Sequence, residues 1–165
     1  PATTYSYYVV AFNSVGSSAN SNTAQATTPP QVEVFNVFVD GTQPTTTTSV
    51  TIVSSDEVQI QHVSGTVCFS SGAGCVDASG YPRASYPIDF VLDSLECADP
   101  DPSANHAAML GWTNEGRFVA GNSTSFSGRT GSIILGVNDC SFTVPPSTCC
   151  YNTGGWNVSI TVTHN

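Results

Sequence analysis

The chain contains no lysine, only three arginines and no long apolar run. Twelve acidic residues outweigh the arginines and give the 165 residues a formal net charge of −9. Such a surface repels nucleic acid and anionic membranes, so we expect neither as a partner. No apolar segment approaches the roughly 18 residues that a membrane-spanning helix needs, so we also expect no membrane insertion. These absences argue against two broad classes of function.

The cysteines indicate the compartment. None of them forms the C-x₂-C pair with matching histidines that is typical of zinc sites. We therefore predict disulfides and a protein that is secreted, extracellular or on the cell surface. The predicted disulfide residues are Cys68, Cys75, Cys97, Cys140, Cys149 and Cys150. We expect Cys68 to pair with Cys75 across a short hairpin, and Cys140 to pair with Cys149 or Cys150 beside a candidate ligand loop.

From Gln31 onward the pattern is typical of β-strands. Alternating apolar residues occur first at Val32, Val34, Val37 and Val39, and then at Val50, Ile52, Val58 and Ile60. Such β-branched side chains fit a pleated, half-buried surface. No segment keeps a helical period for more than two turns. We therefore predict an all-β domain over residues 30–165.

Residues 1–29 form a second unit. Tyr5, Tyr7, Val9 and Ala11 alternate like one face of a strand, and residues 24–27 read as a return strand. The pattern resembles the last two strands of a fibronectin type III domain, with Tyr5 at the tyrosine-corner position. Because a lone hairpin is marginally stable, we expect it to be the end of a longer multidomain chain. The alternative is that it packs on the neighbouring domain or on another copy.

The last third of the chain carries the clearest candidate site. The apolar run 133–137 leads to Asn138 and Asp139, a loop follows, and Asn152 opens the next run. We expect these oxygen-bearing side chains to converge at one edge of a sheet. Hard oxygen ligands of this kind suit calcium, which we predict as the cofactor.

Four segments carry a family resemblance through their order and spacing. These segments are Val50–Ile60, Ala107–Trp112, Phe118–Gly121 and Leu135–Asp139. Over about residues 31–163 the chain resembles the bacterial calcium-dependent galactophilic lectins. The resemblance implies a jelly-roll-like β-sandwich whose calcium is coordinated directly by sugar hydroxyls. It also implies the metal ligands, namely the carbonyl of Phe69, the side chains of Asp139 and Asn152, and a loop carbonyl at Thr148.

The sugar-contacting positions differ from that family. A galactose-binding member carries His-Pro-x-Gln where this chain has Tyr86-Pro87-Ile88-Asp89, so galactose specificity is not inherited. Tyr151 stands where the family has a calcium-binding Asn or Asp. The residues that we predict to contact sugar are Tyr86, Asp89, Asp139 and Tyr151. Trp156 is either a further aromatic face for a sugar ring or a core residue.

Two other patterns have alternative interpretations. The alternation of Asp99, Asp101, Ser103 and Asn105 is either a calcium loop or a solvated acidic loop, since it lacks the Gly and Glu of an EF-hand. Of the three histidines, we expect His62 on a strand, His106 at the end of a loop and His164 in the C-terminal tail. None of them has a Ser or Cys partner in a recognisable nucleophile motif, so we predict no enzyme activity.

Two functions therefore remain. The first is a non-catalytic, calcium-dependent carbohydrate-binding module of a larger extracellular protein. The alternative is a structural subunit of an extracellular fibre or surface layer, self-assembled through strand addition and disulfides.

Overall fold

The computed structural model describes residues 2–68, 74–82, 101, 103–139 and 152–165. The strands are β1 (Thr4–Tyr7), β2 (Phe12–Asn13), β3 (Gly16–Ser17), β4 (Ala24–Thr27), β5 (Gln31–Asp40), β6 (Thr45–Ile52), β7 (Glu57–Cys68), β8 (Cys75–Val76), β9 (Met109–Thr113), β10 (Gly116–Val119), β11 (Ser123–Phe126), β12 (Gly131–Val137) and β13 (Thr153–His164). These residues form no helix, and hence no helix long and apolar enough to cross a membrane. The all-β prediction is confirmed.

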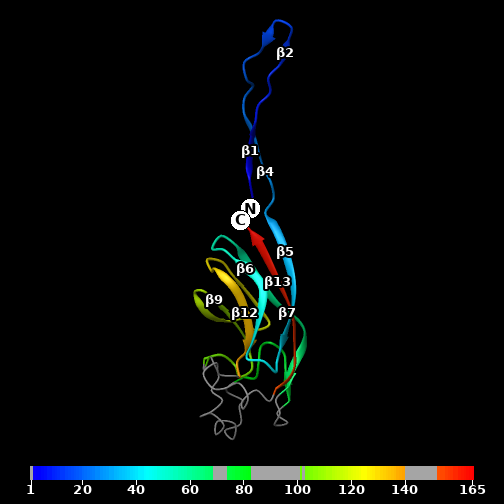
Figure 1. Cartoon of the computed structure of the whole chain (residues 1–165), viewed down its shortest axis with the longest axis vertical. Coiled ribbons are helices and arrows are strands. Elements are labelled where there is room, and N and C mark those ends of the chain that lie inside the picture. Colours follow the sequence, from blue (N-terminus) through cyan, green and yellow to red (C-terminus); the bar gives the residue numbers. More distant parts are fainter. Residues whose placement is uncertain (1, 69–73, 83–100, 102, 140–151) are drawn as a thin grey trace.

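The described residues between 31 and 164 form a β-sandwich of two antiparallel sheets (Figure 1). One sheet has the strand order β10-β9-β12-β6, and the other has the order β11-β7-β13-β5 with β8 added beside β7. Strand β12 ends, and strands β6 and β13 begin, at the same end of the sandwich. This end lies opposite the two chain termini.

The sandwich forms because alternate residues of its strands are apolar and face one core. In β13 the buried positions are Trp156, Val158, Ile160 and Val162, and β12 contributes Ile133, Leu135 and Val137. Burying each of these larger side chains is worth roughly 1.5–3 kcal/mol. The polar run at residues 45–48, which opens β6, joins the sheet because Thr48 is buried and donates its hydroxyl to Ile133 O at 2.6 Å.

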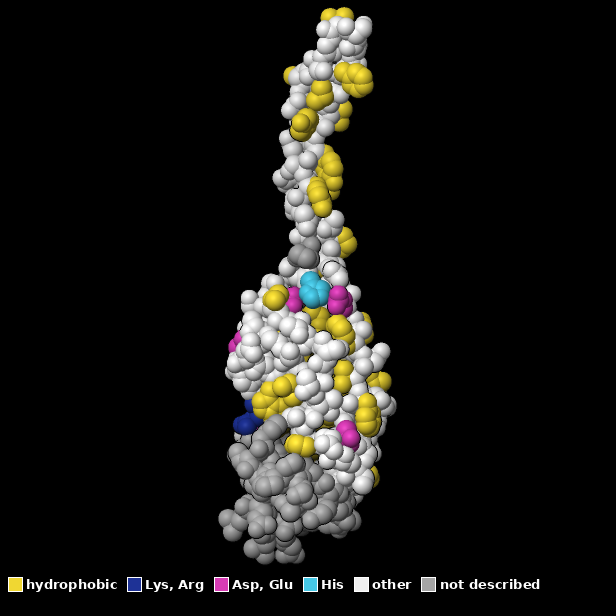
Figure 2. All heavy atoms as spheres, in the orientation of Figure 1, with side chains coloured by type: hydrophobic (Ala, Val, Ile, Leu, Met, Phe, Trp, Pro, Cys, Tyr) yellow, Lys and Arg dark blue, Asp and Glu magenta, His cyan; other side chains and the backbone are white. Residues whose placement is uncertain are grey.

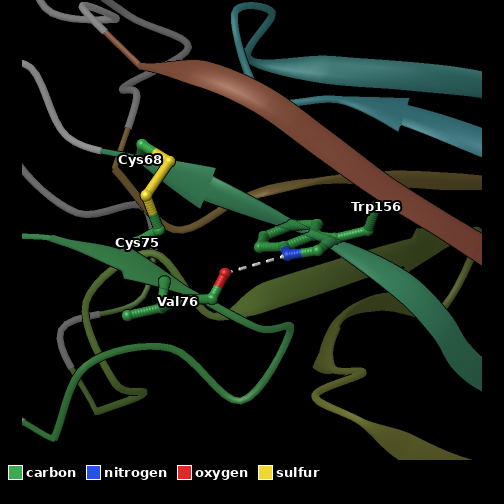
Figure 3. Close-up of a disulfide and its surroundings, with 4 residues drawn as sticks. All are labelled: Cys68, Cys75, Val76 and Trp156. Carbon is green, nitrogen blue, oxygen red and sulfur yellow. Dashed lines mark hydrogen bonds between the residues drawn. A yellow bond between two sulfur atoms is a disulfide. The ribbon is translucent and has the colours of Figure 1, made fainter.

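The predicted Cys68–Cys75 disulfide is present and joins β7 to β8 (Figure 3). Beside it, the indole N–H of Trp156 donates to the Val76 carbonyl at 3.4 Å. The indole is fully buried in the core. Of the two interpretations of Trp156, the structure therefore supports the core residue and not the sugar-binding face.

The N-terminal hairpin extends away from the sandwich (Figure 1). Strands β1 and β4 pair with Tyr5 opposite Ala26 and Tyr7 opposite Ala24, which confirms the predicted return strand, whereas β1 ends before Val9 and Ala11. Hydrophobic side chains lie exposed along the whole hairpin in Figure 2, and Phe12 and Val15 are 86% and 94% exposed. Within the described part of the chain, no sandwich strand pairs with the hairpin.

Two segments differ from their sequence-based interpretation. His164 is the last residue of β13, where its Nδ1 lies 3.0 Å from the Asp56 carboxylate, and it is not part of a tail. Strand β11, which carries the sequence Ser-Thr-Ser-Phe, was not expected. It pairs with β7 because its Thr124 and Phe126 lie opposite Ile60 and Val58.

Candidate functional site

Asp139 and Asn152 meet at one end of the sandwich. Asp139 follows β12 by two residues and Asn152 immediately precedes β13, and these strands belong to different sheets. The Asn152 Nδ2 donates to Asp139 Oδ2 at 2.7 Å. The two side chains therefore converge, as the pattern predicts. The side chains meet between the two sheets, however, and not at the edge of one sheet. The reason is that the consecutive strands β12 and β13 lie in different sheets.

His106 completes this polar group. Its Nε2 lies 3.4 Å from Asp139 Oδ1, and the two side chains are only 12% and 13% exposed. One Asp139 oxygen thus faces an imidazole and the other faces an amide. Sequence reasoning placed His106 at the end of a loop and missed this contact. No spacing signal could have shown it, since His106 and Asp139 are 33 positions apart in the sequence.

The backbone around His106 is tightly constrained. His106 and Tyr81 exchange two main-chain hydrogen bonds, at 2.8 and 3.2 Å. Gly80 adopts φ +73, and a Cβ there would lie 2.5 Å from both His106 O and Ala108 N. Ala107, the next residue after His106, is a buried non-glycine with φ 51. Such backbone is retained only where its surroundings enforce it, so the segment is positioned before any ligand arrives.

Asn138 supports the site without belonging to it. Its side chain is completely buried, and its Oδ1 accepts from Asp101 N at 2.7 Å. Its Nδ2 donates to the carbonyls of Asp101 and Asn105, both at 2.9 Å. The side-chain oxygen therefore binds the main chain at Asp101. Asn138 acts as a clamp, and only Asp139 of the predicted Asn-Asp pair presents its side chain to the candidate site.

The acidic alternation at 99–105 has a structural role in its described part. Asp101 accepts hydrogen bonds from the hydroxyl and the N–H of Ser103. It also forms an ion pair with Arg117, whose Nε lies 3.1 Å from Asp101 Oδ2. The Ser103 hydroxyl, then the Ser103 N–H and then the Arg117 charge hold the pKa of Asp101 below its ordinary value. Asn105 donates to Ser79 O. These contacts support the acidic-loop interpretation over the calcium loop.

The remaining predicted site residues lie outside the described residues. They are Phe69, Thr148, Tyr86, Asp89, Tyr151, Cys97, Cys140, Cys149 and Cys150. Within the described ranges no group of three or more His, Cys, Asp or Glu side chains could hold a metal ion. Asp139 and Asn152 do supply a carboxylate and a carboxamide, which are the oxygen donors that calcium prefers. The described residues thus fit calcium in donor type only.

Comparison with known proteins places the fold. No protein-family model matches the chain, and no curated protein matches it. A solved structure, the N-terminal domain of EclA, described as a PllA-like lectin, is similar with a TM-score of 0.50. The match covers 79% of this chain and 95% of that chain, at 15% sequence identity.

The chain has a lectin-like β-sandwich fold. At this identity the similarity concerns the path of the strands alone, and the ligand of the neighbouring structure does not transfer with it.

Proposed function

We propose that the sandwich is a non-catalytic, calcium-dependent carbohydrate-binding module of a secreted or cell-surface protein. The observation that carries this proposal is the contact between Asp139 and Asn152 at one end of a lectin-like sandwich. Two segments that adjoin strands of different sheets bring a carboxylate and a carboxamide together, beside an imidazole that contacts the same carboxylate. The family resemblance of residues 31–163 supports calcium at this place.

Each residue of the group has a distinct role in this proposal. Asp139 and Asn152 would hold calcium together with the carbonyls of Phe69 and Thr148, and the ion would offer coordination positions to a pair of sugar hydroxyls. The Asp139 carboxylate can also accept hydrogen bonds from those hydroxyls. His106 orients that carboxylate through Oδ1, whereas Asn152 contacts Oδ2. Tyr86, Asp89 and Tyr151 stay predictions for further sugar contacts, and no particular sugar is proposed.

Ligand linkage tests this proposal directly. Thermal unfolding is measured with chelator, with calcium, and with calcium plus each sugar of a monosaccharide panel. Calcium at about 100 times its dissociation constant should stabilise the fold by about 2.7 kcal/mol. For a chain of this length that corresponds to a rise in Tm of about 5–10 °C. A further rise with one sugar, present only with calcium, is the expected result.

Asp139→Asn removes the carboxylate with little change in shape and should abolish the calcium response. Asp40→Asn is the matched control, since the Asp40 carboxylate accepts hydrogen bonds from Thr42 within its own turn. This control should keep the full response. A calcium response that survives Asp139→Asn would place the ion elsewhere, and no response to calcium in the unsubstituted protein would overturn the proposal.

The exposed hairpin favours a second candidate function, a subunit of an extracellular fibre or surface layer. Its apolar side chains lie in water, and such surfaces are typical of interaction sites. A fibre subunit should form large particles that resist dilution and should show no response to any sugar. Light scattering across a dilution series, with and without sugar, distinguishes the two functions.

A further inference from the structure

Strand β5 is the outermost strand of the five-stranded sheet. Its ten residues pair with β13 along one side, in a continuous register from Gln31 opposite His164 to Asp40 opposite Gly155. No other strand of the described chain pairs with β5. A row of main-chain donors and acceptors therefore lies along its second side.

The hydrogen bonds at the end of the strand show which residues form this row. Gly41 N donates to Gly154 O at 3.0 Å, toward the chain that continues into β13. Asp40 N points the other way and donates to Thr46 Oγ1 at 3.3 Å. Main-chain groups alternate in direction along an antiparallel strand, so the odd-numbered residues face β13. The N–H and C=O groups of Val32, Val34, Asn36 and Phe38 thus point to the open edge.

The same residues carry exposed apolar side chains. Val32, Val34 and Phe38 are 57%, 60% and 56% exposed, and they lie on the outer face of the sheet. Proteins usually protect an edge of this length with lysine, proline or a bulge. Strand β5 contains none of these, since its sequence is Gln-Val-Glu-Val-Phe-Asn-Val-Phe-Val-Asp and its register with β13 is regular.

We propose that the open edge of β5 pairs with β5 of a second copy of this chain, in an antiparallel arrangement about a two-fold axis. Such an isologous contact requires the strand to complement itself. With the axis beside Phe35, Val32 lies opposite Phe38 of the second copy, and Val34 lies opposite Asn36. All four residues point their main-chain groups to the partner in this register, and two Val–Phe pairs form on the outer face.

Charge does not oppose this register. Glu33 lies opposite Val37 of the second copy, so no two carboxylates meet, although each chain has a net charge of −9. The two sheets would form one continuous sheet whose central edges are both covered, so the assembly closes as a dimer.

The pairing would also separate the two candidate sites. Strand β5 runs toward the end where Gly154 and Asn152 lie, and its antiparallel copy runs the opposite way. If the proposed glycan function is correct, one dimer would bind two glycan-bearing surfaces on opposite sides. The pairing itself requires neither calcium nor a glycan, so the two proposals fail independently.

Sedimentation equilibrium of the full chain in chelator, from low micromolar to near-millimolar concentration, tests the pairing. The expected result is a reversible monomer–dimer equilibrium. Residue-resolved amide exchange should slow with concentration at Val34, Asn36 and Phe38. Exchange at Phe35 and Val37, which already donate to β13, should not change. A chain that stays monomeric throughout, or protection that ignores this alternation, would overturn the proposal.

Variants separate this edge from other surfaces. Val32→Lys should weaken the dimer at least roughly tenfold, because Val32 lies opposite Phe38 of the second copy and the symmetric contact loses this apolar pair twice. Val63→Lys on β7 is the matched control, since Val63 is 61% exposed away from the edge, and it should leave dimerisation unchanged. Asn36→Pro removes one outward N–H at a position where an edge strand tolerates proline, and it should also give a monomer. A dimer that persists in folded Val32→Lys and Asn36→Pro would show association through another surface.

Discussion

Asn138 provides the sharpest test of how the candidate site is supported. Its buried carboxamide makes three hydrogen bonds to the main chain of the loop 101–108. Replacing Asn138 with alanine removes all three and leaves the N–H of Asp101 and the carbonyls of Asp101 and Asn105 without that partner. The clamp would be lost while the Asp139 side chain itself stays unchanged.

The cost can be worked from these contacts. A hydrogen bond contributes about 1 kcal/mol net to stability, and buried groups left without a partner add to the loss. Three bonds therefore predict a loss of about 3–5 kcal/mol in the free energy of unfolding for Asn138→Ala. For a chain of this length, 1 kcal/mol shifts Tm by about 2–4 °C, so the expected decrease in Tm is about 6–20 °C.

Urea unfolding, followed by the fluorescence of the buried Trp156, measures this loss. Asn157→Ala is the control, because the exposed Asn157 makes a single side-chain bond, to Ser64 Oγ at 3.0 Å. The control should lose less than about 1 kcal/mol. The loss in Asn138→Ala should be equal with calcium and with chelator, since the Asn138 oxygen already accepts from Asp101 N. A loss no larger than that of the control, or one seen only with calcium, would refute the clamp.

Two further predictions concern the turns. Hydrogen bonds from the Thr130 hydroxyl and N–H lower the pKa of Glu115 from 4.5 to about 2. Glu115 should therefore contribute stability that is full above its ordinary pKa and is lost as the pH falls through about 2 to 4, and Glu115→Gln should flatten the pH dependence of the urea midpoint in that range; an unchanged dependence would contradict this. Gly80→Ala should lower Tm more than Gly116→Ala, because both have positive φ but only Gly80 would bring a Cβ against the main chain of His106; equal losses would show that φ strain alone matters.

Local pattern was sufficient for the class of fold and for several elements. Alternating β-branched residues predicted strands, because burial on one face of a strand recurs every second residue. The return strand at residues 24–27 and the Cys68–Cys75 pair are contacts close in sequence, so turn residues and spacing indicated them. Strand β11 was missed because its four residues include only one large apolar side chain.

The site itself needed the tertiary structure. The convergence of Asp139 and Asn152 was predicted, but their position between two sheets follows from the strand order, which no local period contains. His106 joins them, and Asn138 turns away to hold the loop, only because residues more than 30 positions apart are packed together.

What the sequence by itself determined was which residues alternate, and hence an all-β chain with a hairpin, one short disulfide loop and polar residues at the strand ends. What only the tertiary structure decided was which residues and strands are neighbours in space. It places Trp156 in the core, His106 against Asp139, and β5 at the open edge of its sheet. The reason is physical, since burial periodicity is a property of one strand, whereas a strand's neighbours depend on the simultaneous packing of both sheets.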